Sequence, residues 1–312
     1  MKKGRDIRME IRQVSQFFPE RLREAWNRYE VEWEQVQEIR IRVNQPVIVQ
    51  MQERELVTDM IYTERELEDI FRHLCHDSVY AYEQQRCEGY LTLPGGHRVG
   101  ITGELSYIEA TGYFAKYIRY MNIRIAHEKK GVAKSIIEYV KHEKELYNTL
   151  LISPPGIGKT TLLRDLVRML SGYGYTVGVI DERGEIAGAF RGSAGLDCGL
   201  RTDVMTGGEK RLGVQILVRT FSPRIVAMDE IGTKADADAI FYAGVSGCKV
   251  LATAHGNSIQ DIYQKRELGN LMRQKIFQRI LVLSNDKQGR RFVEIWNEEG
   301  DVICGRRLLQ VS

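Results

Sequence analysis

Short apolar runs alternate with longer amphipathic stretches over the second half of the chain, from Asn148 onward. The runs are short and continuous, as expected for strands that are buried on both faces, and the stretches between them are long enough for helices. This alternation predicts a mostly parallel sheet that is covered by helices on both sides. A final pair of strand-like segments predicts a hairpin added to one edge. The five runs are residues 150–152, 177–180, 225–228, 250–253 and 279–283, and the pair is 291–296 and 301–304.

The first part of the chain has a different pattern. Residues 1–35 have the spacing of an amphipathic helix, and residues 38–43 alternate between polar and apolar positions, which predicts a half-buried strand. Thr63 and Glu66 have the spacing of a capping box at the start of a helix. Residues 90–102 predict a β-hairpin around a Pro-Gly-Gly turn. These elements indicate a unit of class α+β.

The two patterns meet near Lys129, Lys130 and Gly131. We therefore expect a smaller α+β N-terminal domain over residues 1–131 and an α/β domain over residues 132–312. A helix from Val132 to about Glu143 should lead into the second domain.

The composition of the chain argues against nucleic-acid binding, an oxidising compartment and a membrane span. The 45 basic and 42 acidic residues nearly balance, at a formal net charge of +3, and no basic stripe stands out, which argues against nucleic-acid binding. The 5 cysteines are scattered without a CxxC pair, which favours a reducing compartment. No signal peptide follows Met1 and no run of about 18 apolar residues occurs, so we expect no membrane span.

The segment from Ser153 to Thr161 lies between a predicted buried strand and a predicted helix. It matches the phosphate-loop pattern GxxxxGK[ST], except that Ser153 replaces the first glycine. The glycines let main-chain N–H groups face an anion, and the helix offers its positive end to the same anion. Lys159 would bind the β- and γ-phosphates of ATP, and Thr160 would ligate Mg²⁺. The predicted nucleotide-binding residues are Pro155, Gly156, Ile157, Gly158, Lys159, Thr160 and Thr161. A glycine-rich turn without a ligand is the alternative, and the strand-to-helix context disfavours it.

Acidic residues follow two of the other predicted strands. The run 225–228 ends in Asp229 and Glu230, the Walker B arrangement, in which Asp229 would hold Mg²⁺ and Glu230 would orient or deprotonate the attacking water. The alternative is a pair of acids that cap the next helix. The run 177–180 is followed by three acids in five residues, Asp181, Glu182 and Glu185, which could face the γ-phosphate or form a solvated loop.

His255 lies at the end of the strand that follows the Walker B arrangement. Ligands bind at the carboxyl ends of parallel strands, so this imidazole could donate to the γ-phosphate and report its hydrolysis. A purely structural histidine is the alternative. Three strand ends are thus expected to converge on one phosphate.

The order of the phosphate loop, an acidic box, Walker B and a Thr-x-His box resembles the type II and type IV secretion ATPases, the traffic and pilus motors. The chain is similar, more closely, to a family of sporulation proteins of endospore-forming bacteria. The resemblance extends from about residue 90 to 257, and its further segments are 95–100, 121–126, 229–233 and 253–257.

The resemblance implies a RecA-like P-loop domain, binding of ATP and Mg²⁺, and a homohexameric ring with nucleotide between subunits. It also implies a cytoplasmic protein of the mother cell, docked on membrane proteins of the channel to the forespore. Glu185 fits the proposed general base of the secretion ATPases, whose Walker B box has Gly-Glu where this chain has Asp229-Glu230. This difference leaves open whether Glu185 or Glu230 is the base.

The secretion ATPases also carry arginines from the N-terminal domain to the phosphates. Arg124 fits this role best, ahead of Arg98 and Arg119, and Arg201 and Arg219 of the second domain are further candidates. Ordinary surface arginines are the alternative for each.

These features together predict a P-loop ATPase that drives transport, with Glu185, Glu230, His255, Lys159 and Arg124 in catalysis and Thr160 and Asp229 at the metal. Two other functions stay open. A nucleic-acid motor would be stimulated by single-stranded DNA, and the near-neutral charge argues against it. A nucleotide-gated assembly scaffold would bind ATP without useful hydrolysis, and the full set of carboxylates argues against that.

Overall fold

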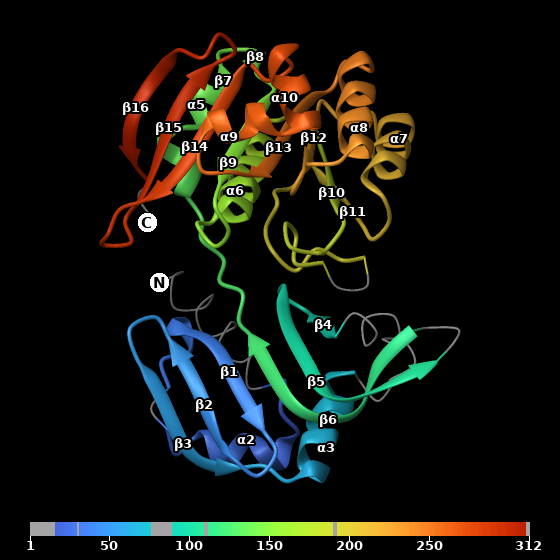
Figure 1. The fold of residues 1–312 in the computed structure, drawn as a ribbon, viewed down its shortest axis with the longest axis vertical. Coiled ribbons are helices and arrows are strands. Elements are labelled where there is room, and N and C mark those ends of the chain that lie inside the picture. The colour runs from blue at the N-terminus through green and yellow to red at the C-terminus, as the bar shows by residue number, and fades with distance from the viewer. Residues whose placement is uncertain (1–15, 30, 76–88, 109–111, 190–191, 310–312) are drawn as a thin grey trace. The chain divides into compact units, whose positions relative to one another are not determined.

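The computed structural model describes residues 16–29, 31–75, 89–108, 112–189 and 192–309. The chain divides into two compact units, residues 1–127 and residues 128–312 (Figure 1). Each unit has its own sheet, and the long sheet of the second unit carries the segments of chemical interest.

The first unit is built on a six-stranded sheet in which every pair of neighbouring strands is antiparallel. The predicted alternation near residue 40 is confirmed, because Ile39 and Ile41 are fully buried. The predicted hairpin around the Pro-Gly-Gly turn is also confirmed. In spatial order the strands are β3 (Glu55–Ile61), β2 (Pro46–Met51), β1 (Val36–Arg42), β6 (Gly112–Arg124), β5 (His97–Ile108) and β4 (Tyr90–Leu93).

Two α-helices of this unit are described, α2 (Glu20–Trp26) and α3 (Glu64–Leu74), with a short 3-10 helix, η1 (Trp33–Gln35). The capping box at the start of α3 is confirmed, since Thr63 and Glu66 bond each other's main-chain N–H groups. The helix predicted over residues 1–35 is wrong in extent, because in its described part the only α-helix is α2. Pro19 has extended backbone, with ψ of 145°, so α2 begins only after it. Residues 1–15 of that predicted helix lie outside the described residues.

The second unit is built on an eight-stranded sheet. Its first six strands run parallel, and the last two add an antiparallel hairpin at one edge, as the sequence predicts. In spatial order the strands are β11 (Thr202–Thr206), β10 (Val177–Asp181), β12 (Ile225–Met228), β13 (Lys249–His255), β9 (Thr149–Ser153), β14 (Arg279–Asn285), β15 (Arg291–Asn297) and β16 (Val302–Leu308).

Helices cover both faces of this sheet (Figure 1). Leu151 of β9 packs into the core under one layer, whereas Leu150 and Ile152 pack under the other, which is why the strand is apolar throughout. One layer contains η3 (Val132–Ser135), α5 (Ile137–Val140) and α6 (Lys159–Gly172), and the other contains α7 (Lys210–Phe221), α8 (Lys234–Val245), α9 (Ile259–Gln264) and α10 (Arg266–Arg273). No helix in the described part of the chain is long and apolar enough to cross a membrane.

The predicted helix from Val132 to about Glu143 is wrong in length. The segment forms η3, then α5, and then a small two-stranded hairpin of β7 (Lys141–His142) and β8 (Glu145–Leu146). The carboxylate of Asp165 in α6 accepts the N–H of Ala133 at 2.8 Å and fixes η3 against α6. Ile136 then leaves helical geometry, with φ −125° and ψ −8°, so one continuous helix cannot form.

His97 is a buried titratable group of the first unit. Its ring packs in a T-shaped arrangement against the Phe17 ring, at 5.1 Å between ring centroids, and its Nδ1 accepts the N–H of Ala126 at 3.0 Å. Burial, with a smaller effect from the charge of His127, lowers the pKa of His97 from 6.5 to about 4. His97 is therefore neutral in the folded chain at neutral pH.

We expect the folded chain to lose stability as the pH falls from about 6.5 to about 4. The unfolded chain takes up a proton on His97 over this range and the folded chain does not, so the free energy of unfolding should fall by up to roughly 3 kcal/mol. Urea unfolding at a series of pH values measures this. His97→Gln keeps an acceptor but cannot titrate, so it should lose much of the dependence. The same pH dependence in both proteins would contradict the assignment.

Candidate functional site

The loop between β9 and α6 has the backbone that an anion-binding loop requires. Gly156 and Gly158 have φ of 78° and 105°, in the left-handed region, and Gly158 is the N-cap of α6. A Cβ on Gly158 would lie 2.9 Å from Nη1 of Arg291, the end of a flexible side chain that can move, so the conformation is what requires glycine there. The loop can therefore curl around a phosphate at the positive end of α6.

Lys159 is the first residue of α6 and is only 6% exposed. Its Nζ lies 3.2 Å from Nδ1 and 3.4 Å from Nε2 of His255, and 3.9 Å from Oε1 of Glu230. The ammonium group therefore lies at the ends of β12 and β13, next to an imidazole and a carboxylate.

Hydrogen bonds join the end of β12 to the start of α6 and to β13. Thr160 donates its hydroxyl to Oδ2 of Asp229 at 2.8 Å, which joins the start of α6 to this strand end. Thr253 of β13 donates to the other oxygen of Asp229, and its own Oγ1 accepts the N–H of Glu230 at 2.9 Å. A hydroxyl and a carboxylate thus meet below the loop, and both are oxygen ligands that suit Mg²⁺.

Glu230 has the left-handed backbone, with φ of 49°, which is rare for a residue that carries a side chain. Its Oε1 lies 3.0 Å from Nε2 of His255, and its Oε2 accepts from Nη1 of Arg183 at 2.6 Å. Burial raises the pKa of Glu230, but the hydrogen bond from His255 and the charges of Arg183, His255 and Lys159 outweigh it and lower the pKa overall. Glu230 is therefore an ionised carboxylate at neutral pH.

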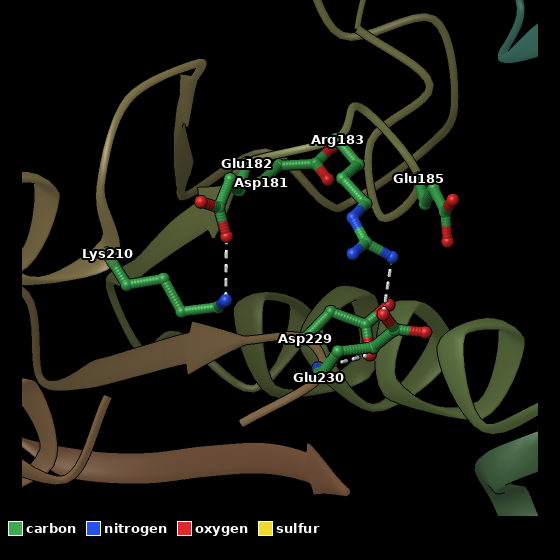
Figure 2. A pocket seen from close by; sticks show the side chains of 7 residues that line it. All are labelled: Asp181, Glu182, Arg183, Glu185, Lys210, Asp229 and Glu230. Atoms are coloured by element: carbon green, nitrogen blue, oxygen red, sulfur yellow. Dashed lines mark hydrogen bonds and ion pairs between the residues drawn. The ribbon is translucent and has the colours of Figure 1, made fainter. Parts of the chain in front are cut away.

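The loop after β10 supplies the other side of a pocket, which Figure 2 shows from close by. Asp181 is buried and accepts the N–H groups of Ile186 and Ala187, so it shapes the loop from within. Burial raises the pKa of Asp181 although these main-chain bonds oppose the rise. Glu182 instead pairs with Lys210 at 2.7 Å. The residues that line the pocket are Asp181, Glu182, Arg183, Glu185, Lys210, Asp229 and Glu230.

The residues singled out from the sequence fall into two groups. Lys159, Thr160, Asp229, Glu230 and His255 are in mutual contact, and Glu185 lines the same pocket as the two Walker B acids. The other predicted loop residues, Pro155, Gly156, Ile157, Gly158 and Thr161, form the turn and the first turn of α6.

Each candidate arginine has a partner within its own unit. In the first unit, Arg124 on β6 lies 3.7 Å from Glu38 and Arg119 pairs with Glu64 at 2.8 Å, while Arg98 stacks on Tyr90. In the second unit, Arg201 donates to the main chain of Ser171 at the far end of α6, and Arg219 donates to the hydroxyl of Tyr242.

Two arginines at the site were not predicted from the sequence. Arg183 reaches Glu230 from the loop after β10, residues 182–187, which is called the acidic loop below. Arg291 of β15 lies against Gly158 of the phosphate loop. The signal for Arg183 is its place between acids at the end of a buried strand. Arg291 carries no such signal, because only the pairing of β14, β9 and β15 brings its strand beside the loop.

Solved structures share this fold. The chain is similar to the X-ray structure of the Legionella pneumophila ATPase DotB, at a TM-score of 0.55 and 17% identity, covering 85% of this chain and 78% of that chain. It is also similar to the crystal structure of the pilus retraction motor PilT with bound ADP, at a TM-score of 0.55 and 15% identity, covering 83% and 78% of the two chains. The fold class is confirmed: an N-terminal antiparallel-sheet domain precedes a mostly parallel sheet of the RecA-like kind.

The sequence comparisons cover nearly the whole chain. Residues 8–303 match the family model described as sporulation stage III, protein AA. Stage III sporulation protein AA of Bacillus subtilis (strain 168) is 34% identical over 300 residues, which are 94% of this chain and 97% of that protein. The chain therefore belongs to the family of stage III sporulation protein AA.

Proposed function

We propose that the chain is an ATP-hydrolysing motor that energises the channel between mother cell and forespore during endospore formation. The observation that supports this most strongly is the convergence of Lys159, Thr160, Asp229, Glu230 and His255 at one end of the parallel sheet. A binding scaffold needs a phosphate loop, but it does not need an ionised carboxylate and an imidazole beside it. Hydrolysis uses the phosphate-loop lysine, the Mg²⁺ ligands and a residue that positions the attacking water.

The loop residues and Mg²⁺ would hold the triphosphate. Lys159 would bind the β- and γ-phosphates, and the amides from Gly156 to Thr161 would face their oxygens. The hydroxyl of Thr160 and the carboxylate of Asp229, 2.8 Å apart, would hold Mg²⁺, for which both are suitable oxygen ligands. When bound, Mg²⁺ supplies positive charge that neutralises the phosphate oxygens.

The proposed reaction is an in-line attack of water on the γ-phosphorus. A bond forms between the water oxygen and phosphorus while the bond to the bridging oxygen breaks, and the electron pair of that bond leaves with ADP. The water proton passes to Glu230, whose carboxylate lies next to both Lys159 and His255. Glu185 would support the water from the opposite side of the pocket. His255 would donate to the γ-phosphate and sense its loss.

The assembly belongs to the same proposal. As the resemblance to secretion ATPases implies, six copies would form a ring in the cytoplasm of the mother cell and dock on membrane proteins of the channel. Arg124 of one subunit would reach the phosphates on its neighbour and add positive charge there. Closure of the N-terminal domain over the nucleotide would then turn hydrolysis into movement.

Lys159→Ala should abolish ATP turnover while the protein stays folded. The ammonium group is the main charge on the transferred phosphate, so we expect release of inorganic phosphate from Mg·ATP to fall by at least about 100-fold. Lys287→Ala, which removes an exposed lysine from the turn before β15, should keep the wild-type rate. Circular dichroism establishes that both variants are folded. Undiminished turnover in Lys159→Ala would reject the site.

Glu230→Gln should reduce turnover more than Glu185→Gln does. Loss of the base costs about 100-fold or more in kcat, whereas loss of a supporting group costs less, so we expect a clear ranking in a phosphate-release assay. The glutamine keeps the shape of each side chain. If Glu185→Gln is the more damaging change, Glu185 is the base and Glu230 has another role.

Arg124→Ala should inactivate the enzyme in a way that a neighbouring subunit can repair. Turnover should fall about 100-fold or more, because a charge on the phosphates is lost. An equal mixture of Arg124→Ala and Lys159→Ala subunits should regain turnover, since some shared sites then contain both side chains. Arg40→Ala is the matched control, because Arg40 also pairs with Glu38, at 2.9 Å. Full activity in Arg124→Ala would exclude this arginine from the site.

A further inference from the structure

Arg183 is a cation of the pocket to which the mechanism above gives no role. It follows β10 in the acidic loop, its side chain is 61% exposed, and its Nη1 donates to Oε2 of Glu230 at 2.6 Å. Figure 2 shows the guanidinium group reaching from that loop toward Asp229 and Glu230. An arginine thus lies over the carboxylates that face the phosphate loop.

The main chain on either side of Arg183 is held firmly. Asp181 accepts the N–H of Ile186 at 3.0 Å and that of Ala187 at 2.8 Å. Arg164 of α6, which is 8% exposed, donates to the carbonyl of Glu185 at 2.8 Å and to that of Ile186. These bonds fasten the acidic loop to the helix that begins at the phosphate loop. The main chain at Arg183 is therefore held in place relative to the phosphate loop. The guanidinium group can change its partner by rotation of the side chain alone.

Glu230 is the shared partner of three side chains, those of Lys159, Arg183 and His255. Its Oε1 lies 3.0 Å from Nε2 of His255 and 3.9 Å from Nζ of Lys159, and its Oε2 accepts a hydrogen bond from Arg183. A γ-phosphate bound to Lys159 would bring more charge and more oxygen acceptors to the same place. Arginine binds phosphate with two parallel hydrogen bonds, so phosphate competes well against a single bond to one carboxylate oxygen.

We propose that Arg183 is a catalytic arginine that exchanges its bond to Glu230 for bonds to the γ-phosphate of ATP. The exchange places positive charge on the phosphate as its charge develops, and it frees Glu230 to take the proton of the attacking water. Arg183 forms no covalent bond in this step. The inference rests on the proposed function, and it adds a cation from the same chain to the one that Arg124 would supply from a neighbour.

The exchange makes the site sensitive to the γ-phosphate in particular. ADP lacks the group that Arg183 binds, so with ADP the pair of Arg183 and Glu230 stays intact. Arg183 should therefore favour ATP over ADP, and this discrimination can be measured without any turnover.

The test compares binding of a non-hydrolysable ATP analogue and of ADP, each with Mg²⁺, by calorimetry on the full chain. Arg183→Gln should weaken binding of the analogue about ten-fold and leave ADP binding unchanged. The same variant should lower kcat for ATP about 100-fold, and Arg183→Lys should recover part of that loss. Arg290→Gln is the matched control, because Arg290 is equally exposed, at 61%, and also pairs with one carboxylate at 2.6 Å, on Asp286. It should match the wild type in every measurement.

A double-mutant cycle tests the exchange itself. Glu230→Gln removes the competing carboxylate, so it should tighten binding of the ATP analogue about three-fold or more. In the Arg183→Gln background the same change should tighten binding less, because only Lys159 and His255 are then released. Equal tightening in the two backgrounds would mean that Arg183 does not move between the two anions.

The outcomes separate this inference from the proposed function. If the wild type binds and hydrolyses ATP but Arg183→Gln behaves like Arg290→Gln, the role of Arg183 is wrong and the ATPase proposal stands. Equal loss of ATP and ADP binding in Arg183→Gln also contradicts the exchange. If the wild type binds neither nucleotide, both proposals are overturned.

Discussion

The parallel register of neighbouring strands is the constraint on which the site depends. His255 at the end of β13 pairs with Ser153 at the end of β9, and on the other side β13 runs in register with β12, Ala252 opposite Met228. The residues that leave these strands therefore meet at one edge of the sheet. The N–H of Gly256 bonds the carbonyl of Ser153 at 3.2 Å, so the strand that carries the imidazole is joined to the start of the phosphate loop. The active groups need no long loops to reach one another.

The site combines a fixed frame with exchangeable contacts. Buried groups such as Asp181 and Arg164 bond only to main chain in the acidic loop, and burial lowers the pKa of Arg164 without making it neutral at physiological pH. The partners of Glu230 are different, because each of them can also bind phosphate. A nucleotide would therefore change the ion pairs of the site while the frame keeps its shape. A conformational switch requires this combination. A change of ion pairs at the site can move other parts of the protein only if the surrounding structure is rigid.

Periodicity and motif spacing predict much of this arrangement from the sequence, and the failures have physical causes. The continuous apolar runs predict the parallel strands, because a strand that is buried on both faces of its sheet has apolar residues at successive positions. The helix expected from Val132 to Glu143 is interrupted at Ile136, whose backbone leaves helical geometry, and η3 before it is held against α6 by Asp165, which is distant in sequence. β11, with the half-exposed sequence Thr-Asp-Val-Met-Thr, has no apolar run to mark it. Arg183 escapes prediction because its partner, Glu230, lies 47 residues away in the sequence, after a different strand.

A crystal structure with Mg²⁺ and a non-hydrolysable ATP analogue tests the central claim most directly. We expect the triphosphate to lie within the loop from Gly156 to Thr161, with Lys159 on its β- and γ-phosphates and Mg²⁺ between Thr160 and Asp229. Glu230 and His255 should face the γ-phosphate. A nucleotide bound elsewhere, or phosphates that touch none of these side chains, would contradict the claim that the ends of these strands form one site for ATP.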